Sequence, residues 1–304
     1  MKRVGIIRGG TQGDYDASLK NGGEIISHIF DNLGDKWKVV DIFIDKGGVW
    51  HAGGIAVEPV SLPQRVDVVW NVAHPYISNI IDSLNIPQIN ISSFSFLLKQ
   101  NSEALADHIK ELDLKMPKKI VLPVYQPDFD GDMGTYVMKK AKEIHQKFPA
   151  PWVVRSYTPD LDMGVHLAKT FPELVRAIED GVRHGKSILV EEFIYGKSTS
   201  LHSVSGFRDK DVYVFPVGNL SAQAGFAKHE KEVLEELAIE LHKHLGVEHY
   251  LKTDIAIHPK RGIFVTDINL QPDLREGSHL HNMAESIGAK MHHIVDHMLE
   301  KVLK

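Results

Sequence analysis

The chain has 304 residues, of which 43% are apolar and 25% charged, and its formal net charge is −5. This composition excludes a disordered chain, a collagen-like repeat and a fibrous rod, and the acidic balance leaves no basic footprint for nucleic acid. No apolar run approaches the ~20 residues of a membrane helix, so we expect no membrane segment. The absence of cysteine excludes disulfides and thiolate metal sites, and it is consistent with a cytoplasmic location.

The N-terminal part of the chain alternates strand-like and helix-like segments. Apolar runs that end in glycine or proline indicate strands, and apolar residues at helical spacing indicate helices. Strands are expected over Lys2–Arg8, Trp37–Ile44, Val66–Val72 and Pro87–Ile91, and helices over Asp16–Leu33 and Ile77–Leu84. This βαβ series predicts a parallel sheet covered by helices.

The middle of the chain predicts a smaller α+β region. Asn101 is a good N-cap for a helix that ends near Leu112, and Tyr125–Gly134, rich in Pro, Asp and Gly, is predicted to be a loop. Two helices and the strand between them are expected over Thr135–Phe148, Pro151–Arg155 and Phe171–His184.

The C-terminal part predicts antiparallel strands. A hairpin-like series is expected over Ile188–Ile194, Ser198–Phe207 and Asp211–Val217, and a second strand pair over Tyr250–Ile257 and Gly262–Asn269. Helices are expected over Lys228–Leu245, Asn282–Ile287 and Lys290–Leu303. The fold class is therefore a combination of α/β and α+β, with predicted domains at residues 1–95, 96–185 and 186–304.

The last strand pair carries a candidate metal site. A short turn would bring Asp254 beside Asp267 and Asn269, and the last two share a strand face because they are two residues apart. Two carboxylates and an amide oxygen suit Mg²⁺ bound to the phosphates of ATP. Lys252 shares the face of Asp254 and would neutralise phosphate charge. A polar, solvent-facing strand surface is the alternative interpretation.

A second candidate segment is Lys186–Gly196. Its apolar strand runs into Glu191 and Glu192, then Phe193 and Ile194, and this end would line an adenine pocket. One carboxylate would accept from the amino group of adenine while backbone groups contact the ring edge. The alternative is a strand whose end simply emerges into solvent.

Histidines are abundant, and 10 of the 18 lie from residue 229 onward. His74 follows a predicted strand, where it would bind substrate or serve a structural role. His293 and His297 are four apart on a predicted helix, without an evident third metal ligand, so we expect surface histidines. The same expectation covers His242 and His244.

Taken in order, these segments resemble the D-alanine–D-alanine ligases of the ATP-grasp superfamily, as a divergent member. The resemblance covers most of the chain. It rests on Val4–Gly22 for the first strand, glycine turn and helix, on Val69–His74, Pro151–Arg155 and Ile188–Gly196 for three further strands, and on Tyr250–Asp254, Phe264–Asn269, Pro272 and Ser278 for the closing motif.

The resemblance implies an ATP-grasp fold and a role for individual residues. Asp14 and His74 stand at the subsite for the first D-alanine, and Ser278 stands where the carboxylate of the second is held. Lys252 stands where a cation stabilises the acyl-phosphate and the tetrahedral intermediate.

The resemblance also implies the cofactors. ATP would be bound by Arg155, Glu191, Glu192, Phe193 and Ile194, with Lys252 and Asp267 at its phosphates. Asp254, Asp267 and Asn269 would hold two Mg²⁺ ions, with Mn²⁺ as a substitute. The implied reaction joins two amino acids through an acyl-phosphate, as in cell-wall peptidoglycan synthesis, and the implied assembly is a homodimer with no nucleic-acid or membrane partner.

Several positions depart from the family pattern, among them three at the expected ATP and oxyanion sites. Arg155 replaces a phosphate-binding lysine, Ala106 stands near the position of a second lysine, and Asp273 replaces a glycine whose backbone N–H would serve the oxyanion. Two alternatives therefore stay open: a non-catalytic or nucleotide-binding ATP-grasp relative, and a ligase for another amino acid or amine.

Overall fold

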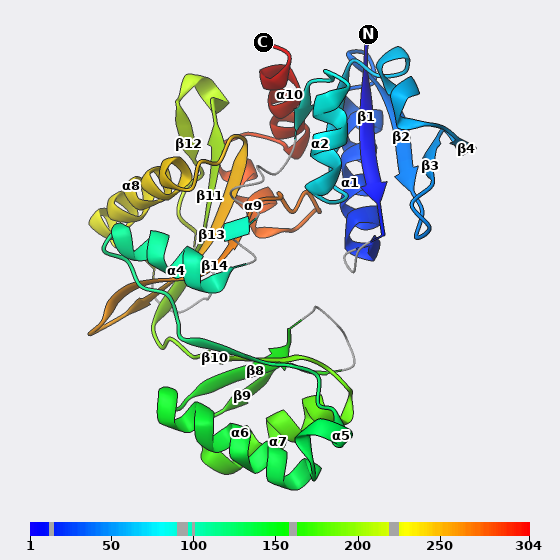
Figure 1. The fold of residues 1–304 in the computed structure, drawn as a ribbon. Coiled ribbons are helices and arrows are strands. Elements are labelled where there is room, and N and C mark those ends of the chain that lie inside the picture. The colour runs from blue at the N-terminus through cyan, green and yellow to red at the C-terminus, as the bar shows by residue number, and fades with distance from the viewer. Residues whose placement is uncertain (12–14, 90–96, 99–100, 158–162, 219–224) are drawn as a thin grey trace. The chain divides into compact units, whose positions relative to one another are not determined.

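The computed structural model describes residues 1–11, 15–89, 97–98, 101–157, 163–218 and 225–304 (Figure 1). The chain forms two compact units. The first comprises residues 1–113, 198–255 and 267–304, and the second comprises residues 114–197 and 256–266. The three-domain division with boundaries near residues 95 and 185 stays a prediction beside this two-unit description. Among the described residues, no helix is long and apolar enough to cross a membrane.

The first unit begins with a six-stranded sheet in the order β4-β3-β2-β1-β5-β6. The central strands pair in parallel, as predicted, and α1 and α2 belong to the same βαβ series. The bounds are β1 Lys2–Gly9, α1 Tyr15–Asn32, β2 Trp37–Ile44, β3 Trp50–Ala52, β4 Ile55–Ala56, β5 Val68–Asn71, α2 Tyr76–Ser83 and β6 Gln88–Ile89, with a 3₁₀ turn at Pro59–Gln64. The short antiparallel strands β3 and β4 were not predicted, because three and two residues carry no readable alternation.

The end of β1 requires glycine. Val4, Ile6 and Ile7 are completely buried, as expected for a central parallel strand. Gly9 follows with a φ of +86°, and a Cβ there would lie 2.2 Å from the carbonyl oxygen of Ile44. Glycine at position 9 is therefore required by the packing of β1 against β2.

A second sheet, whose strands belong to the first unit except for residues 197, 256–258 and 262–266, has the order β12-β11-β13-β14. Its strands are β11 Lys197–Ser205, β12 Val212–Val214, β13 Tyr250–His258 and β14 Gly262–Asn269, and a 3₁₀ turn spans Phe207–Asp209. The associated helices are α4 Ser102–Glu111, α8 Lys228–His244, α9 His279–Ser286 and α10 Met291–Val302. The predicted pairing of the last two strands is confirmed.

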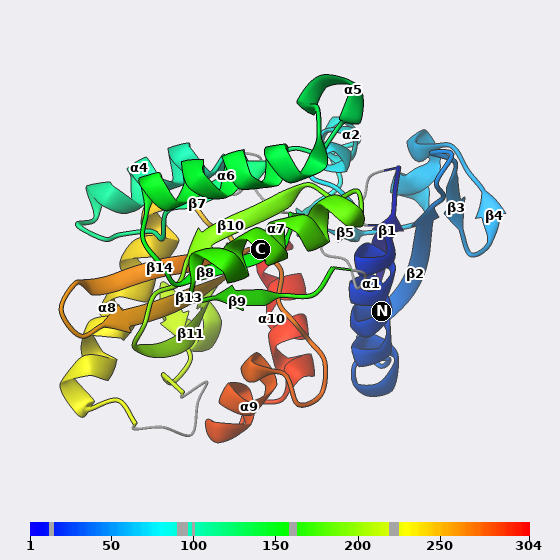
Figure 2. The ribbon, with the colours of Figure 1, turned by 90° about the horizontal axis from the view of Figure 1, so that it is seen from below.

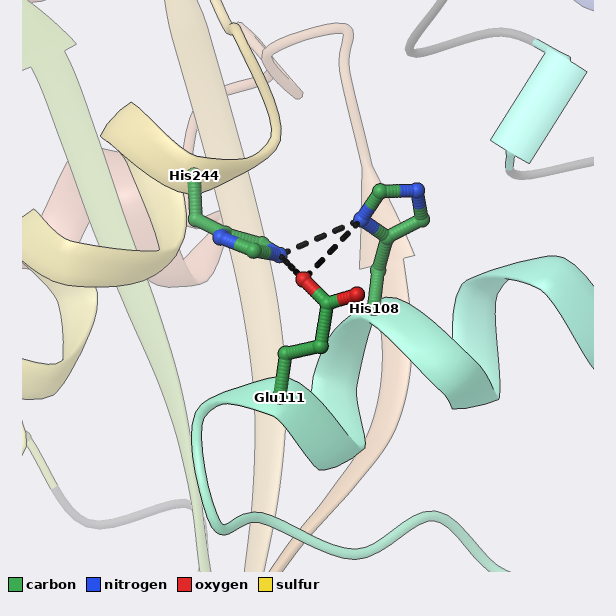
Figure 3. Close-up of side chains that lie close together, drawn as sticks. All are labelled: His108, Glu111 and His244. Carbon is green, nitrogen blue, oxygen red and sulfur yellow. Dashed lines mark hydrogen bonds and ion pairs between the residues drawn. The ribbon is translucent and has the colours of Figure 1, made fainter.

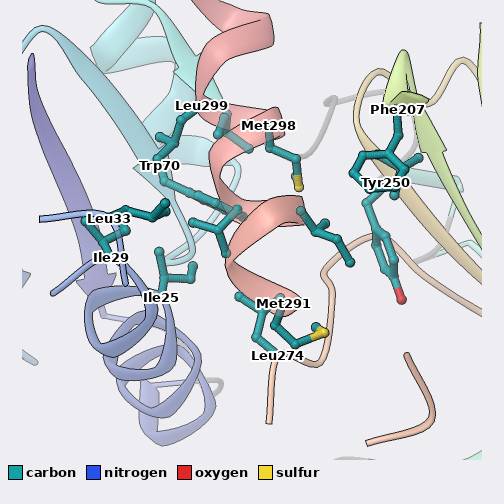
Figure 4. Packing of buried hydrophobic residues seen from close by; sticks show 14 of the residues in the cluster. Ile25, Ile29, Leu33, Trp70, Phe207, Tyr250, Leu274, Met291, Met298 and Leu299 are labelled. Carbon is teal, nitrogen blue, oxygen red and sulfur yellow. The ribbon is translucent and has the colours of Figure 1, made fainter. Parts of the chain in front are cut away.

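One hydrophobic core joins both sheets of this unit. Figure 4 shows α1 and α10 contributing side chains to it around Trp70 of β5, together with Phe207 and Tyr250 from the second sheet. At the edge of this core, Nε1 of Trp37 donates to Asp296 of α10 at 2.6 Å, and Lys36 forms ion pairs with Asp296 and Glu300. The last helix is thus fixed to the N-terminal sheet by apolar packing and by charge.

The second unit is a four-stranded sheet in the order β7-β10-β8-β9. Its elements are β7 Lys119–Leu122, α5 Pro127–Asp130, α6 Met133–Lys147, β8 Trp152–Ser156, β9 His166–Ala168, α7 Phe171–Arg183 and β10 Ile188–Glu192. Figures 1 and 2 show α6 and α7 on one face of the sheet, where they enclose a core that includes Trp152, Val154 and Ile188. The short helix α5 lies inside the segment predicted to be a loop.

The expected hairpin-like series from residue 188 was wrong for its first strand. β10 pairs with β7 and β8 in the second unit, whereas β11 pairs with β12 and β13. Gly196 lies between the two strands with a φ of +145°, and a Cβ there would meet the carbonyl oxygen of Ile257 at 2.0 Å. This close backbone approach requires glycine and separates β10 from β11.

His242 is buried rather than on the surface. It lies on α8, 1% exposed, and its ring nitrogens lie 2.8 Å and 2.7 Å from the hydroxyls of Ser203 and Ser205 on β11. Burial lowers its pKa to about 4, and burial lowers the pKa of His249 to about 4 as well. His293 is exposed, as predicted, whereas His244 and His297 are half-buried, and Nε2 of His297 lies 2.9 Å from the carbonyl oxygen of Ser205. The apolar spacing of α8 does not reveal that a histidine fills this position.

These two histidines predict an acid-sensitive fold. A histidine protonates near pH 6.5 in the unfolded chain but near pH 4 in the folded one, so the unfolded state binds more protons between these values. The stabilisation is complete above pH 6.5, and each histidine removes up to about 1.4 kcal/mol per pH unit as the pH falls toward 4.

Thermal unfolding between pH 7.5 and 4.5 measures this effect. His242→Gln should lower the Tm at pH 7.5 and flatten its pH dependence, whereas His293→Gln at an exposed site should leave both unchanged. An unaltered pH dependence in His242→Gln would contradict the assignment.

Candidate active site

The polar face of β13 is the centre of the candidate site. Leu251, Thr253 and Ile255 are buried, whereas Lys252 and Asp254, which alternate with them, are partly exposed. The Nζ of Lys252 lies 2.9 Å from Oδ2 of Asp254. The two-residue period of the strand thus presents the charged pair on one face, as the sequence predicted.

Asp254 has a second partner that the sequence did not reveal. Ser200 on the neighbouring strand β11 donates a hydrogen bond to its Oδ1. Both carboxylate oxygens are therefore oriented by protein groups, one by a hydroxyl and one by an ammonium group.

The adjacent strand β14 supplies the other two predicted metal ligands. Asp267 is exposed and Asn269 half-buried, and Ile268 between them is buried, so the first two share a strand face. The Oδ1 of Asn269 accepts from the backbone N–H of Gln271 at 3.1 Å. Oxygen donors thus lie on both strands of the hairpin.

The segment after β14 is tied to α1 and contains Ser278. The Nδ2 of Asn21 donates to Gln271 at 3.2 Å. Ser278 is the N-cap of α9: its hydroxyl accepts from the N–H of His281 at 3.1 Å and donates to the carbonyl of Asp273 at 3.0 Å. The predicted substrate serine therefore stands at a helix start, with its hydroxyl in local hydrogen bonds.

Asp273, which stands where the ligase resemblance predicts a glycine, is paired with Arg275. Two hydrogen bonds of 2.8 Å and 2.5 Å join the guanidinium to the carboxylate and lower the pKa of Asp273. Nearby, burial and the charge of Asp273 raise the pKa of Glu24 on α1. Arg275 therefore neutralises the charge of Asp273.

A histidine pair, His202 buried and His279 half-buried, lies beside the charged face. The Nδ1 of His202 on β11 lies 2.7 Å from the hydroxyl of Tyr250, and its Nε2 lies 2.8 Å from Nδ1 of His279. Burial, reinforced by His279 and Lys252, lowers the pKa of His202 to about 3, so its ring is neutral. This network orients Tyr250, which shares a strand face with Lys252. The sequence signal for this network was a histidine, His202, in the middle of the predicted strand that became β11.

In the second unit, Glu191 lies between two cations. Lys119 on β7 stands directly opposite it in register, with 3.0 Å between Nζ and Oε1, and Nε of Arg155 on β8 lies 3.2 Å from Oε2. The carboxylate is only 15% exposed, so removing one cation would leave a largely desolvated charge with fewer partners. Lys119 was not among the predicted site residues, because the four residues of β7 were not predicted to form a strand.

The three residues after Glu191 make different contacts within the protein. Glu192 is buried and paired with Arg261 at 2.6 Å, so its side chain is committed to the protein. The backbone N–H of Phe193 donates to Pro151 at 3.0 Å, and Ile194 packs with Ala256 and Phe264. The predicted adenine-binding carboxylates are therefore both ion-paired.

The remaining predicted residues lie near the N-terminal sheet. His74 follows β5, its Nδ1 accepts from the N–H of Tyr76 at 3.2 Å, and its carbonyl accepts from Asn71 at 3.1 Å. Asp14 lies outside the described residues. The N–H of Gly9 before it donates to Ser18 on α1 at 3.0 Å, which fixes the start of the turn.

The sequence is similar to those of known ligases over almost its whole length. No family model matches it. It is 20% identical to the D-alanine–D-alanine ligase of Solibacter usitatus, across 99% of the chain and 95% of the relative, and 21% identical to that of Fervidobacterium nodosum, across 99% of each. The chain is thus similar to D-alanine–D-alanine ligases along almost its whole length, at a low level of identity.

Solved structures agree in fold. The VanG D-Ala:D-Ser ligase of Enterococcus faecalis matches with a TM-score of 0.72 at 18% identity, covering 99% of each chain. D-alanyl-alanine synthetase A of Vibrio cholerae matches with a TM-score of 0.74 at 15% identity, covering 99% of this chain and 98% of that one. A D-alanine–D-alanine ligase of Bacillus anthracis, solved with ATP, matches at 0.68. The predicted resemblance and the ATP-grasp fold class are confirmed.

Proposed function

We propose that this chain is an ATP-dependent carboxylate–amine ligase that forms a dipeptide through an acyl-phosphate. The observation that carries the proposal is the oriented charged pair Lys252–Asp254 on β13, with Asp267 and Asn269 on the adjacent β14, in a chain that aligns end to end with the ligases. A fold retained only for packing has no need of two carboxylates and a lysine that are not buried on two adjacent strands.

The donor set suits Mg²⁺, with Mn²⁺ as a substitute. Carboxylate and amide oxygens are hard ligands, and Asp254, Asp267 and Asn269 provide three of them. When bound, the ions would neutralise charge on the phosphate oxygens. Ser200 and Lys252 hold the Asp254 carboxylate in one orientation for this role.

The proposed reaction has two steps. A carboxylate oxygen of the first amino acid attacks the γ-phosphorus of ATP, and the bond to the bridging oxygen breaks to release ADP. The amine of the second amino acid then attacks the acyl carbon, loses a proton, and phosphate leaves. Lys252 would stabilise negative charge as it develops on the phosphoryl and acyl oxygens.

Nucleotide binding is assigned to the second unit. We assign the phosphate-binding cations to Arg155 and, in addition, Lys119, because both reach the same partly exposed face at Glu191. The edge of adenine would be contacted by the strand end from Glu191 to Ile194. Because the Glu192 side chain is held by Arg261, its contribution would come from the backbone.

Amino-acid binding is assigned to Asp14, His74 and Ser278. D-alanine is the first substrate to test, because the curated relatives carry that name. The Asp273–Arg275 pair beside Ser278 makes another small amino acid or amine the next substrate to test. We further propose that the protein acts in the cytoplasm as a homodimer.

A second function has one specific observation in its favour. Arg155 and Lys119 share the carboxylate of Glu191, so they keep net positive charge for binding phosphate but supply less of it to stabilise a phosphoryl group in transfer than two cations without that carboxylate would. This favours a nucleotide-binding relative without turnover. The two functions differ in whether phosphate is released.

Phosphate release from ATP and Mg²⁺, with a panel of D- and L-amino acids, tests the proposal. We expect release that depends on one amino acid, most simply D-alanine, with a dipeptide detected by mass spectrometry. Nucleotide binding without release under every condition would replace the proposal with the second function.

Asp267→Asn tests the hairpin face. Replacing an exposed carboxylate should lower kcat by about 10²- to 10³-fold, the usual cost of losing one group that stabilises developing charge, and should leave the Tm within a few degrees. Asp35→Asn, also exposed, is the matched control and should retain full activity. Equal activity in Asp267→Asn and Asp35→Asn would exclude Asp267 from the site.

Arg155→Ala tests the nucleotide assignment. Loss of one charge-assisted contact should weaken ATP binding by about 10- to 100-fold, measured by calorimetry, and Lys119→Ala should act in the same direction. Arg176→Ala, an exposed arginine on α7, should bind ATP normally. Unchanged ATP affinity in both Arg155→Ala and Lys119→Ala would contradict the role of this cation pair.

A further inference from the structure

Two helices of the first unit bring three metal-binding side chains together. His108 and Glu111 lie on the last turn of α4, and His244 is the last residue of α8. Figure 3 shows the three side chains directed toward one point. Among the described residues, they form the cluster of histidine and carboxylate groups whose ligand atoms lie within 4.8 Å of one another.

The distances fit one tetrahedral ion. The Nδ1 of His108 and Nε2 of His244 are 3.2 Å apart, and Oε2 of Glu111 lies 3.5 Å from His244 and 4.0 Å from His108. Ligands at about 2.0–2.1 Å from a tetrahedral zinc are separated by about 3.3 Å. The glutamate is 64% exposed, so a small rotation brings its oxygen to that separation.

The positions on the helices favour a cation. His108 and Glu111 are three residues apart and therefore share one face of α4. Both helices end at the cluster, α4 at Glu111 and α8 at His244, and the carbonyl groups of helix C-termini carry partial negative charge. An ion there would receive two imidazole nitrogens, a carboxylate oxygen and the field of two helix ends.

We propose that His108, Glu111 and His244 bind a divalent transition-metal ion, with Zn²⁺ as the preferred ion and water as its fourth ligand. Imidazole nitrogens select Zn²⁺ over Mg²⁺, which prefers oxygen donors. The site is separate from the oxygen ligands on β13 and β14 in both residues and chemistry. A bound ion would join α4 to α8. Helix α4 ends at Glu111, two residues before the chain leaves the first unit at Asp113.

Metal titration of the full chain tests this site. Untagged protein is stripped with a chelator, dialysed, and titrated with ZnCl₂ by calorimetry in excess Mg²⁺, which occupies oxygen-only sites. We expect one Zn²⁺ per chain with a Kd of micromolar or below, and a Co²⁺ derivative with the visible absorption of a tetrahedral nitrogen–oxygen site. His108→Ala and His244→Ala should each weaken binding at least 30-fold.

Three further variants keep the test decisive. His293→Ala removes an exposed histidine on α10 and should bind Zn²⁺ as the unmodified chain does. Glu111→Gln changes an exposed side chain and should fold normally while binding about tenfold more weakly. His108→Asn is a milder change to be used if the alanine variant does not fold.

Thermal unfolding gives an independent readout. Saturating Zn²⁺ should raise the Tm of the unmodified chain by several degrees, because the ion binds the folded state alone, and the rise should be absent in His244→Ala. Equal Zn²⁺ affinity in the unmodified chain, His108→Ala and His244→Ala would overturn the proposal, as would the absence of any binding below millimolar Zn²⁺.

Discussion

The alternation of side chains along β11 and β13 is the constraint on which the candidate site depends. On β11, Ser203 and Ser205 contact His242 of α8, whereas Ser200 and His202 point to the other face and contact Asp254 and Tyr250 of β13. Packing one face against α8 therefore leaves the opposite face to carry charge. A shift of one residue in the register would place Lys252 and Asp254 against the helix, where burial of two charges is costly.

Two charged residues at positions where the ligase resemblance predicts other residues are ion-paired in the structure. Arg155 contacts Glu191, and the neighbouring strand places Lys119 against the same carboxylate, so two cations stand on one face of the second unit. Asp273 is paired with Arg275, which neutralises its charge. Neither position therefore leaves an unpaired charge at its place in the fold.

The sequence predicted the long elements and the charged hairpin because both rest on local periodicity. Strands such as Trp37–Ile44 and the pair at residues 250–269 have clear two-residue alternation, and their pairing follows from a short turn. The short strands β3, β4 and β7 carry too few residues for a pattern, and β10 pairs across the chain rather than with its successor. Contacts of this second kind, including Lys119–Glu191, Ser200–Asp254 and His108–His244, depend on tertiary packing and leave no trace in residue spacing.

In the proposed reaction an amino-acid carboxylate receives the γ-phosphoryl group of ATP, and isotope transfer measures that step directly. The protein is incubated with ATP, Mg²⁺ and an amino acid labelled with ¹⁸O in its carboxylate, and the released phosphate is analysed by mass spectrometry. We expect one ¹⁸O atom in each phosphate and a dipeptide that has lost one label from its acyl residue. Phosphate released without ¹⁸O would mean that water, not the amino acid, accepts the phosphoryl group, and it would contradict the proposed ligase reaction.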